Sequence, residues 1–290
     1  MKRVSIVTDS TACVPQEFVE KYGIHVVPIN VIFEDRVYRD GLDITPREVY
    51  ALLQEAKRLP TTASPPPGEY LEIYREASKG TDSILCISIS SSLTSIFQSA
   101  QQAMEMAKED LPGIAIEVLD CRTAAGGQAF IVMEAARAAA SGCSLHEVME
   151  VAKRMMPRVN VIVVLDTLYY LAKGGRIPKA AAWAGSLFKI KPIIEVVKGE
   201  VGLLERARTK PRGVERILTI MRERVGIAKS VHVIVMHANA PREAEQLKDR
   251  VVSEFNCAEL YTTEFTPVMG VHVGPGLLGL AFYSEQDSEE

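Results

Sequence analysis

Apolar runs and amphipathic stretches alternate along the first half of the chain. Four runs rich in β-branched residues predict strands, at residues 4–7, 24–33, 83–89 and 114–119. Apolar residues at helical spacing between them predict helices, at residues 15–23, 45–56, 96–107, 126–140 and 144–156. Such alternation is typical of a parallel sheet with helices on both faces, so we predict an α/β fold for this half.

The pattern changes near Pro157. Two strands, 192–197 and 201–208, are joined by Lys198-Gly199-Glu200 and predict a β-hairpin. A last strand, 277–283, follows a glycine-rich turn at 269–276. We therefore predict an α+β second half with a mixed or antiparallel sheet. The domains are expected at residues 1–157 and 158–290.

Polar residues follow three of the strands predicted for the first half. Asp9-Ser10-Thr11, Ser90 to Ser95, and Asp120 occupy these strand ends. Ligands of parallel α/β sheets bind at the carboxyl ends of the strands, so this edge is the expected binding side. The loop from Pro60 to Gly68 contributes hydroxyls too, and its three consecutive prolines predict an extended backbone without a helix.

Arg176 lies in a stretch with an unusual pattern. A strand, 161–165, runs into a short predicted helix that Gly174 ends, since glycine tolerates the left-handed conformation. Pro178 is expected to begin a second helix, which leaves Arg176 on the corner between the two. A guanidinium held there suits anion binding. Capping of the carbonyls of helix 169–173 by Arg176 explains the pattern equally well.

Composition narrows the range of functions. The chain has 290 residues, 47% of them hydrophobic, a formal net charge of −4 and no basic run, so we expect no nucleic-acid partner. Five cysteines are scattered without metal-type spacing, which indicates a reduced, cytoplasmic protein. No secretory signal is expected, because Asp9 ends the first apolar run, and the apolar segment 180–188 is too short to cross a bilayer.

Common catalytic and cofactor motifs are absent from the sequence. There is no Walker loop, no Gly-x-Ser-x-Gly and no paired-cysteine site. We expect no cofactor, and we interpret the loop and strand-end acids as turn residues and not as metal ligands. The candidate binding groups are loop hydroxyls, one guanidinium and one imidazole: Thr62, Ser64, Ser91, Ser92, Thr94, Ser95, Arg176 and His272. For the hydroxyls, turn and N-cap roles are the alternative.

Five motifs in order make the chain resemble the DegV family, the fatty-acid-binding carrier subunits of bacterial fatty acid kinase. They are Asp9-Ser10-Thr11, Thr62 before the prolines, Ser90-Ser91 to Gln98-Ser99-Ala100, Tyr170 to Ile177, and His272-Val273-Gly274-Pro275-Gly276. The resemblance implies two α/β domains with an acyl chain between them. It also implies a partner kinase that transfers phosphate from ATP.

The resemblance assigns roles to particular residues. Loop hydroxyls would hold the fatty-acid carboxylate: Thr62, Thr94, Ser91 and Ser92. Arg176, His272 and Ser10 would lie near the carboxylate or the phosphorylated product. The second loop departs from the family pattern, because Ser92, Thr94 and Ser95 replace its glycines and serine. Segment 180–188 and the Phe97–Met104 face are candidates for lining the acyl tail.

The residues alone are also compatible with two other functions. The first is an enzyme that acts on a small phosphorylated or carboxylated metabolite at the inter-domain cleft, with Asp9, Arg176 and His272 as reactive groups. The second is a structural or regulatory module. For the carrier, the expected partners are a long-chain fatty acid and a kinase subunit, and transient contact with a membrane surface is compatible with that role.

Overall fold

The first half of the chain builds a parallel sheet. In this computed structural model, which describes residues 4–55, 58–177, 190–226 and 230–285, four parallel strands follow the order β2-β1-β6-β7. Their bounds are β1 Val4–Asp9, β2 His25–Val27, β6 Ser83–Ser88 and β7 Ala115–Asp120. A 3-10 turn, η1 Ser10–Ala12, follows β1. The parallel sheet predicted from the sequence is confirmed.

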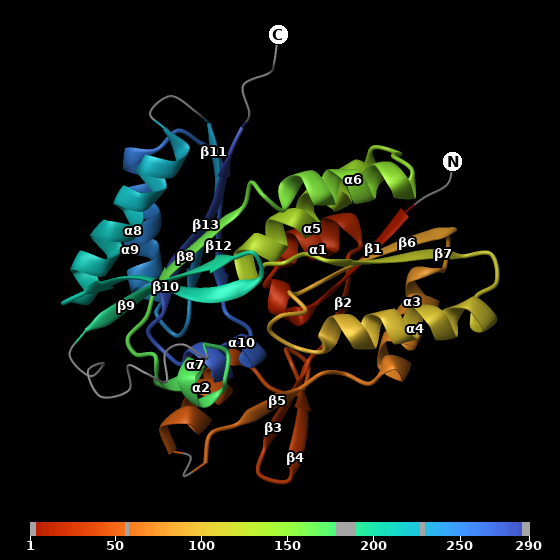
Figure 1. Cartoon of the computed structure of the whole chain (residues 1–290), viewed down its shortest axis with the longest axis horizontal. Coiled ribbons are helices and arrows are strands. Elements are labelled where there is room, and N and C mark those ends of the chain that lie inside the picture. Colours follow the sequence, from red (N-terminus) through yellow and green to blue (C-terminus); the bar gives the residue numbers. More distant parts are fainter. Residues whose placement is uncertain (1–3, 56–57, 178–189, 227–229, 286–290) are drawn as a thin grey trace.

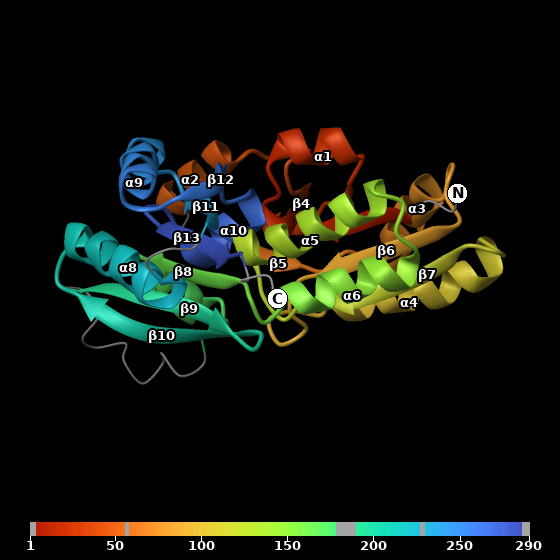
Figure 2. The same ribbon diagram turned by 90° about the horizontal axis from the view of Figure 1, so that it is seen from above.

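Helices cover both faces of this sheet (Figures 1 and 2). One face carries α3 Pro67–Ala77 and α4 Ile96–Asp110. The other carries α5 Ala125–Ala140 and α6 Leu145–Met155, with α1 Gln16–Tyr22 against α5. We call this sheet with its five helices the first lobe.

The second half builds a mixed sheet in the order β10-β9-β8-β13-β11-β12. The strands are β8 Asn160–Val164, β9 Lys191–Val197, β10 Glu200–Ala207, β11 Val231–His237, β12 Cys257–Glu264 and β13 Leu278–Ser284. Among these six strands, β11 and β12 pair in parallel and the other neighbours pair antiparallel. Helices α8 Lys210–Val225 and α9 Pro241–Glu254 cover one face, and we call this sheet and these helices the second lobe.

Helix α5 joins the two lobes, because it packs on β1 and β6 as well as on β13 and β8. Glycines allow this close approach: a Cβ on Gly126 would lie 2.6 Å from the Cβ of Ala281, and one on Gly127 would lie 2.6 Å from Val161. The four-stranded sheet precedes Pro157 and the six-stranded sheet follows it. The domain boundary at that residue stays a prediction.

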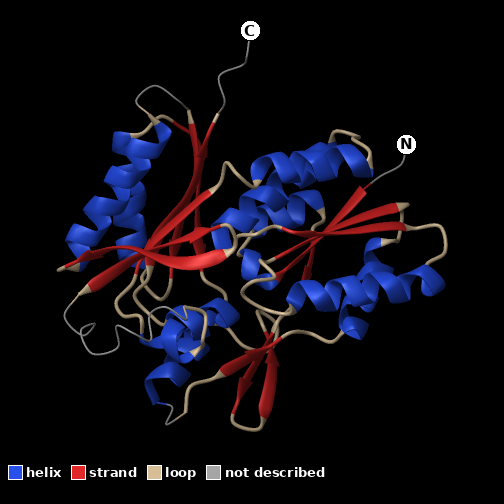
Figure 3. Cartoon of the chain, viewed as in Figure 1, coloured by secondary structure: helices blue, strands red, loops and turns tan. Residues whose placement is uncertain are grey.

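A small antiparallel sheet lies beside the two lobes (Figure 3). It contains β3 Asn30–Phe33, β4 Arg36–Arg39 and β5 Thr61–Ala63. Three helices lie near it: α2 Pro46–Glu55, α7 Tyr169–Lys173 and α10 Pro267–Val273. The single strand predicted at 24–33 is wrong. Pro28 separates β2 from β3, and the two pair in different sheets.

The predictions for helix caps, the hairpin and the proline loop were partly correct. Both capping boxes are confirmed, since Thr45 bonds reciprocally with Glu48 and Ser144 with Glu147. The hairpin of β9 and β10 is confirmed as well. The exclusion of a helix from the proline loop is wrong at its end, because Pro67 is the first residue of α3, where a missing N–H costs nothing.

The glycine assignments near Arg176 and His272 need two corrections. Helix α7 ends as predicted, but Gly174 has a right-handed backbone and Gly175 is the left-handed residue, with φ +73°. The predicted turn at 269–276 is partly helical, because α10 runs to Val273. The helix expected from Pro178 and the segment 180–188 lie outside the described residues. Among the described helices, none has the length and apolar character needed to cross a membrane.

Candidate functional site

A cavity of about 590 Å³ is lined by residues from both lobes and from the small sheet. Most of its wall is apolar. The second lobe contributes aliphatic side chains from three neighbouring strands: Val161, Val163, Ile194, Val196 and Val201. Ile29, Ile89, Leu93 and Phe265 add further apolar surface. Among the described residues of the wall there is no aspartate or glutamate. The volume lies within the ~300–1,000 Å³ usual for small-molecule pockets.

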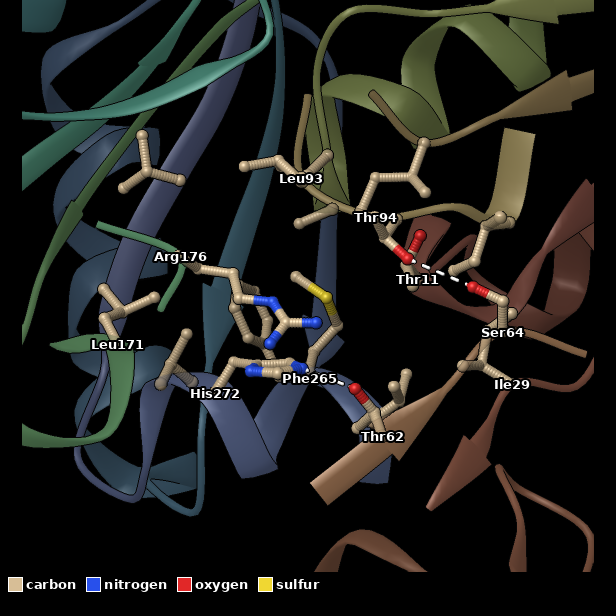
Figure 4. Close-up of a pocket in the computed structure, with 18 of the residues that line it drawn as sticks. Thr11, Ile29, Thr62, Ser64, Leu93, Thr94, Leu171, Arg176, Phe265 and His272 are labelled. Atoms are coloured by element: carbon tan, nitrogen blue, oxygen red, sulfur yellow. Dashed lines mark hydrogen bonds between the residues drawn. The ribbon is translucent and has the colours of Figure 1, made fainter. Parts of the chain in front are cut away.

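Hydroxyls gather at one side of the cavity (Figure 4). Thr62 lies in β5, which pairs with β3 and thereby fixes the direction of its side chain. Ser64 and Thr94 come from the two loops singled out by the sequence, and their oxygens lie 3.4 Å apart. Ser64 also lies 2.8 Å from the hydroxyl of Ser95. These uncharged groups are suited to hydrogen bonding with a carboxylate.

Arg176 faces the same cavity from the turn after α7 (Figure 4). Its backbone N–H donates to the carbonyl of Leu171 at 3.1 Å, and its guanidinium donates to the carbonyl of Gly174. Arg176 therefore bonds to the carbonyl at the end of α7 and also lines the cavity. Partial burial lowers the pKa of Arg176 from its ordinary value, yet the group stays charged. No ion pair joins Arg176 to a carboxylate within the described part of the chain.

His272 lies beside Arg176 in the last turn of α10. Its Nε2 is 2.8 Å from the hydroxyl of Thr62. Burial, and then the positive charge of Arg176, lower the pKa of His272 to about 4, so the ring is neutral near pH 7. The buried Nδ1 has no hydrogen-bond partner among the described residues. A cation and a neutral imidazole thus lie next to each other on the wall of a mostly apolar cavity.

The candidate residues do not all meet at this place. Thr62, Thr94, Arg176 and His272 line the cavity. The described wall does not include Ser91, Ser92 or Ser10. Ser91 donates instead to Asp120, Ser10 donates to Asp40, and the N–H of Ser92 donates to the hydroxyl of Ser90.

The strand-end motif Asp9-Ser10-Thr11 reaches the cavity wall only through its last residue. Thr11 faces the cavity, and it is held by Asp9, which also accepts from the N–H of Ile89 and from Gln128. Burial raises the pKa of Asp9, and the carboxyl itself does not line the cavity. Of the Phe97–Met104 face only Ser99 lines it, because α4 presents its first turn. The aliphatic wall of β8, β9 and β10 carries no motif that could have marked it.

The described residues contain no group of three or more His, Cys, Asp or Glu side chains that could hold a metal ion. Fold and cavity together define a two-lobed α/β protein with a mostly apolar cavity whose wall also carries hydroxyls, one guanidinium and one imidazole. The chain belongs to the DegV family, whose model matches residues 3–285.

Relatives and solved structures agree over nearly the full length. A DegV domain-containing protein of Clostridium acetobutylicum is 34% identical, with 98% of this chain and 99% of that protein covered. A Thermus thermophilus structure described as fatty acid binding of a DegV family protein has a TM-score of 0.90 at 31% identity, covering 98% of this chain and 100% of that one. DegV from Bacillus subtilis, described as a fatty acid binding protein, has a TM-score of 0.88 at 29% identity, covering 98% and 100%.

Proposed function

We propose that this protein binds a long-chain fatty acid in an inter-domain tunnel and presents its carboxyl group to a kinase for acyl-phosphate formation. The observation that carries the proposal is the position of Arg176. A partly buried guanidinium, without a carboxylate partner among the described residues, faces a cavity whose described wall has no acid. Such a group is matched by an anion that the ligand brings.

The apolar and polar parts of the cavity wall suit the acyl chain and the carboxylate of a fatty acid. Burial of about fourteen methylenes contributes roughly 11 kcal/mol before the costs of association, at about 0.8 kcal/mol for each. A hydrogen bond to the carboxylate adds about 1.5–3 kcal/mol. The aliphatic wall therefore sets the affinity, while Thr62 and Thr94 orient the carboxylate and Arg176 and His272 lie beside it.

Transfer of phosphate is assigned to a partner. The cavity holds no pair of carboxylates and no glycine-rich phosphate loop among its described residues. Resemblance to the carrier subunits of fatty acid kinase supports the kinase partner. The carboxyl of Asp9, which the alternative enzyme would use, does not line this cavity and accepts the N–H of Thr11. Asp9 instead lines a separate, smaller cavity of about 270 Å³ together with Ser10 and Asp40.

The test is to identify and exchange the ligand. Protein purified from its host is denatured and analysed by mass spectrometry for fatty acids, and delipidated protein is then titrated with palmitate and oleate. We expect a co-purified fatty acid, saturable binding with one chain per protein, and no acyl phosphate when ATP is added to loaded protein alone. Protein that carries no lipid and binds neither fatty acid would refute the proposal. Turnover of a soluble substrate by the protein alone would favour the enzyme.

A further inference from the structure

Asp40 lies where three parts of the molecule meet. It follows β4, and its side chain is almost completely enclosed, with 3% of the residue exposed. One carboxylate oxygen accepts the N–H of Val268 at 3.1 Å, and the other accepts the hydroxyl of Ser10. Val268 is in the first turn of α10, and Ser10 begins the turn after β1. A single side chain thus joins the small sheet, the first lobe and the helix that carries His272.

Helix α10 depends on such contacts for its position. With seven residues it is too short to be stable by itself. At its far end, Gly274 lies against the ring of Tyr170, where a Cβ would come within 2.1 Å of the ring, and the ring of His272 lies against Gly174. At its near end, the bond between Asp40 and Val268 fixes the first turn.

The hydrogen bond between Asp40 and Val268 affects the cavity because of the spacing of residues along α10. His272 follows Val268 by four residues, so the two lie on the same face one turn apart, and both line the cavity. A rotation of the first turn would move the imidazole and break its 2.8 Å contact with Thr62.

Asp40 is ionised near neutral pH, which makes its two hydrogen bonds charge-assisted. Burial raises the pKa of Asp40 to about 6. The titratable groups that face it are Asp9, Cys13 and Tyr50. Burial raises the pKa of Cys13 to about 12 and raises that of Tyr50 further, so neither of these carries charge at neutral pH.

We propose that Asp40 is a positioning residue for the anion-binding end of the cavity: through Val268 it sets the rotation of α10 and hence the place of His272 beside Thr62. The inference rests on the proposed function for the identity of the anion. It concerns a residue that does not line this cavity and that contacts α10 through the N–H of Val268.

The experiment compares delipidated wild type with Asp40→Ala and Asp40→Asn, using palmitate labelled with carbon-13 at its carboxyl carbon. We expect Asp40→Ala to bind about tenfold more weakly, since it removes a charge-assisted acceptor, and Asp40→Asn to lose a smaller factor. In both variants, the NMR chemical shift of the carboxyl carbon of bound palmitate should differ from that in wild type. Asp43→Ala is the matched control, because Asp43 is in the same loop but is exposed and pairs with Arg39. It should match wild type.

The outcomes separate positioning from mere stabilisation. The inference would be overturned if folded Asp40 variants bind palmitate with wild-type affinity and leave the chemical shift of its carboxyl carbon unchanged. It would also be overturned if a lower Tm were the only change in the variants. If Asp40→Ala does not fold, the Asn variant decides, because it keeps the shape of the side chain. If wild type binds no palmitate, the proposed function fails, and the NMR signals of the His272 ring in the ligand-free proteins test the inference instead. Different chemical shifts in Asp40→Asn and wild type would support positioning, and identical shifts would overturn it.

Discussion

His272 Nε2 lies 2.8 Å from the Thr62 hydroxyl, although 210 positions separate the two residues in the chain. The contact joins β5 of the small sheet to α10. His272 has no other hydrogen-bond partner among the described residues, since its Nδ1 is unpaired. The Thr62 hydroxyl that we propose for carboxylate binding is therefore also the partner of the His272 imidazole.

Thr62→Ala should weaken palmitate binding and also lower stability. The variant removes a hydroxyl from the carboxylate and leaves the buried ring of His272 without a partner, which costs about 1–3 kcal/mol of unfolding free energy. We expect palmitate affinity to fall about tenfold. Urea unfolding and palmitate titration measure the two effects. Thr62→Ser should restore most of both, and Thr61→Ala, at the exposed neighbouring position, should change neither. Unaltered binding would mean that Thr62 only orders its loop.

Arg176→Gln should remove the preference for an anion. Wild type should bind palmitate more tightly than hexadecanol, because only the acid presents a charge to the guanidinium. In the variant we expect palmitate affinity to fall about tenfold and hexadecanol affinity to stay the same. Competitive displacement of a bound fluorescent fatty acid measures both ligands in one assay. Equal losses for the acid and the alcohol would show that Arg176 shapes the turn after α7 and does not select the ligand's charge.

The fold could be predicted where local signals decide it. The two capping boxes and the turn Lys198-Gly199 place their elements correctly, because each depends on residues adjacent in sequence. Helix α10 was missed for the opposite reason. Its sequence has three valines and a glycine in seven residues, which disfavours a helix. It is held by Asp40 and by the packing of Tyr50 on Gly270, contacts made by residues far away in the chain.

The polar part of the cavity was easier to predict than its walls. Thr62, Thr94, Arg176 and His272 stand out in the sequence as isolated polar groups among glycines, prolines and hydroxyls. Ser10 and Ser91 have the same appearance, and only the structure shows that Asp40 and Asp120 occupy their hydroxyls. The apolar wall has no signature, because a valine that lines a cavity and one that packs in a core look alike in sequence.

Val196→Phe should shorten the acyl chain that fits. Val196 lines the cavity in β9, so a ring placed there takes space from the ligand and not from the closely packed core. If it displaces about two methylenes, palmitate affinity falls about tenfold, at about 0.8 kcal/mol for each methylene, and laurate affinity changes less. Val197→Phe is the matched control, since the next residue of a strand points to the other face and Val197 is 47% exposed. Titration with both acids tests the prediction, and equal effects of the two variants would contradict it.

His272 should make the protein less stable in acid. Its pKa is about 4 in the folded state, against an ordinary 6.5. Between these values the unfolded chain binds more protons at this site than the folded protein does. The stability that the neutral ring contributes is therefore complete above about pH 6.5 and is lost as the pH falls towards 4. The full shift corresponds to about 3 kcal/mol. Urea unfolding of wild type and His272→Gln from pH 7.5 to 4.5 should show a smaller acid loss in the variant. Parallel curves would contradict the lowered pKa.

At Asp40 the dependence of stability on pH should have the opposite sign, and Asp40→Asn should remove it. The pKa of Asp40 rises from 3.8 to about 6 on folding, so between these values the folded state binds more protons at this site than the unfolded chain. Ionised Asp40 therefore costs stability above pH 6, by about 2–3 kcal/mol, and nothing below pH 4. We expect the Asn variant to unfold at higher urea than wild type at pH 7.5 and at the same urea near pH 4. A variant that is more stable at pH 7.5 yet binds palmitate less tightly would show that the charge fixes α10 at a cost to the fold. A variant less stable than wild type at every pH would contradict this account of the carboxylate.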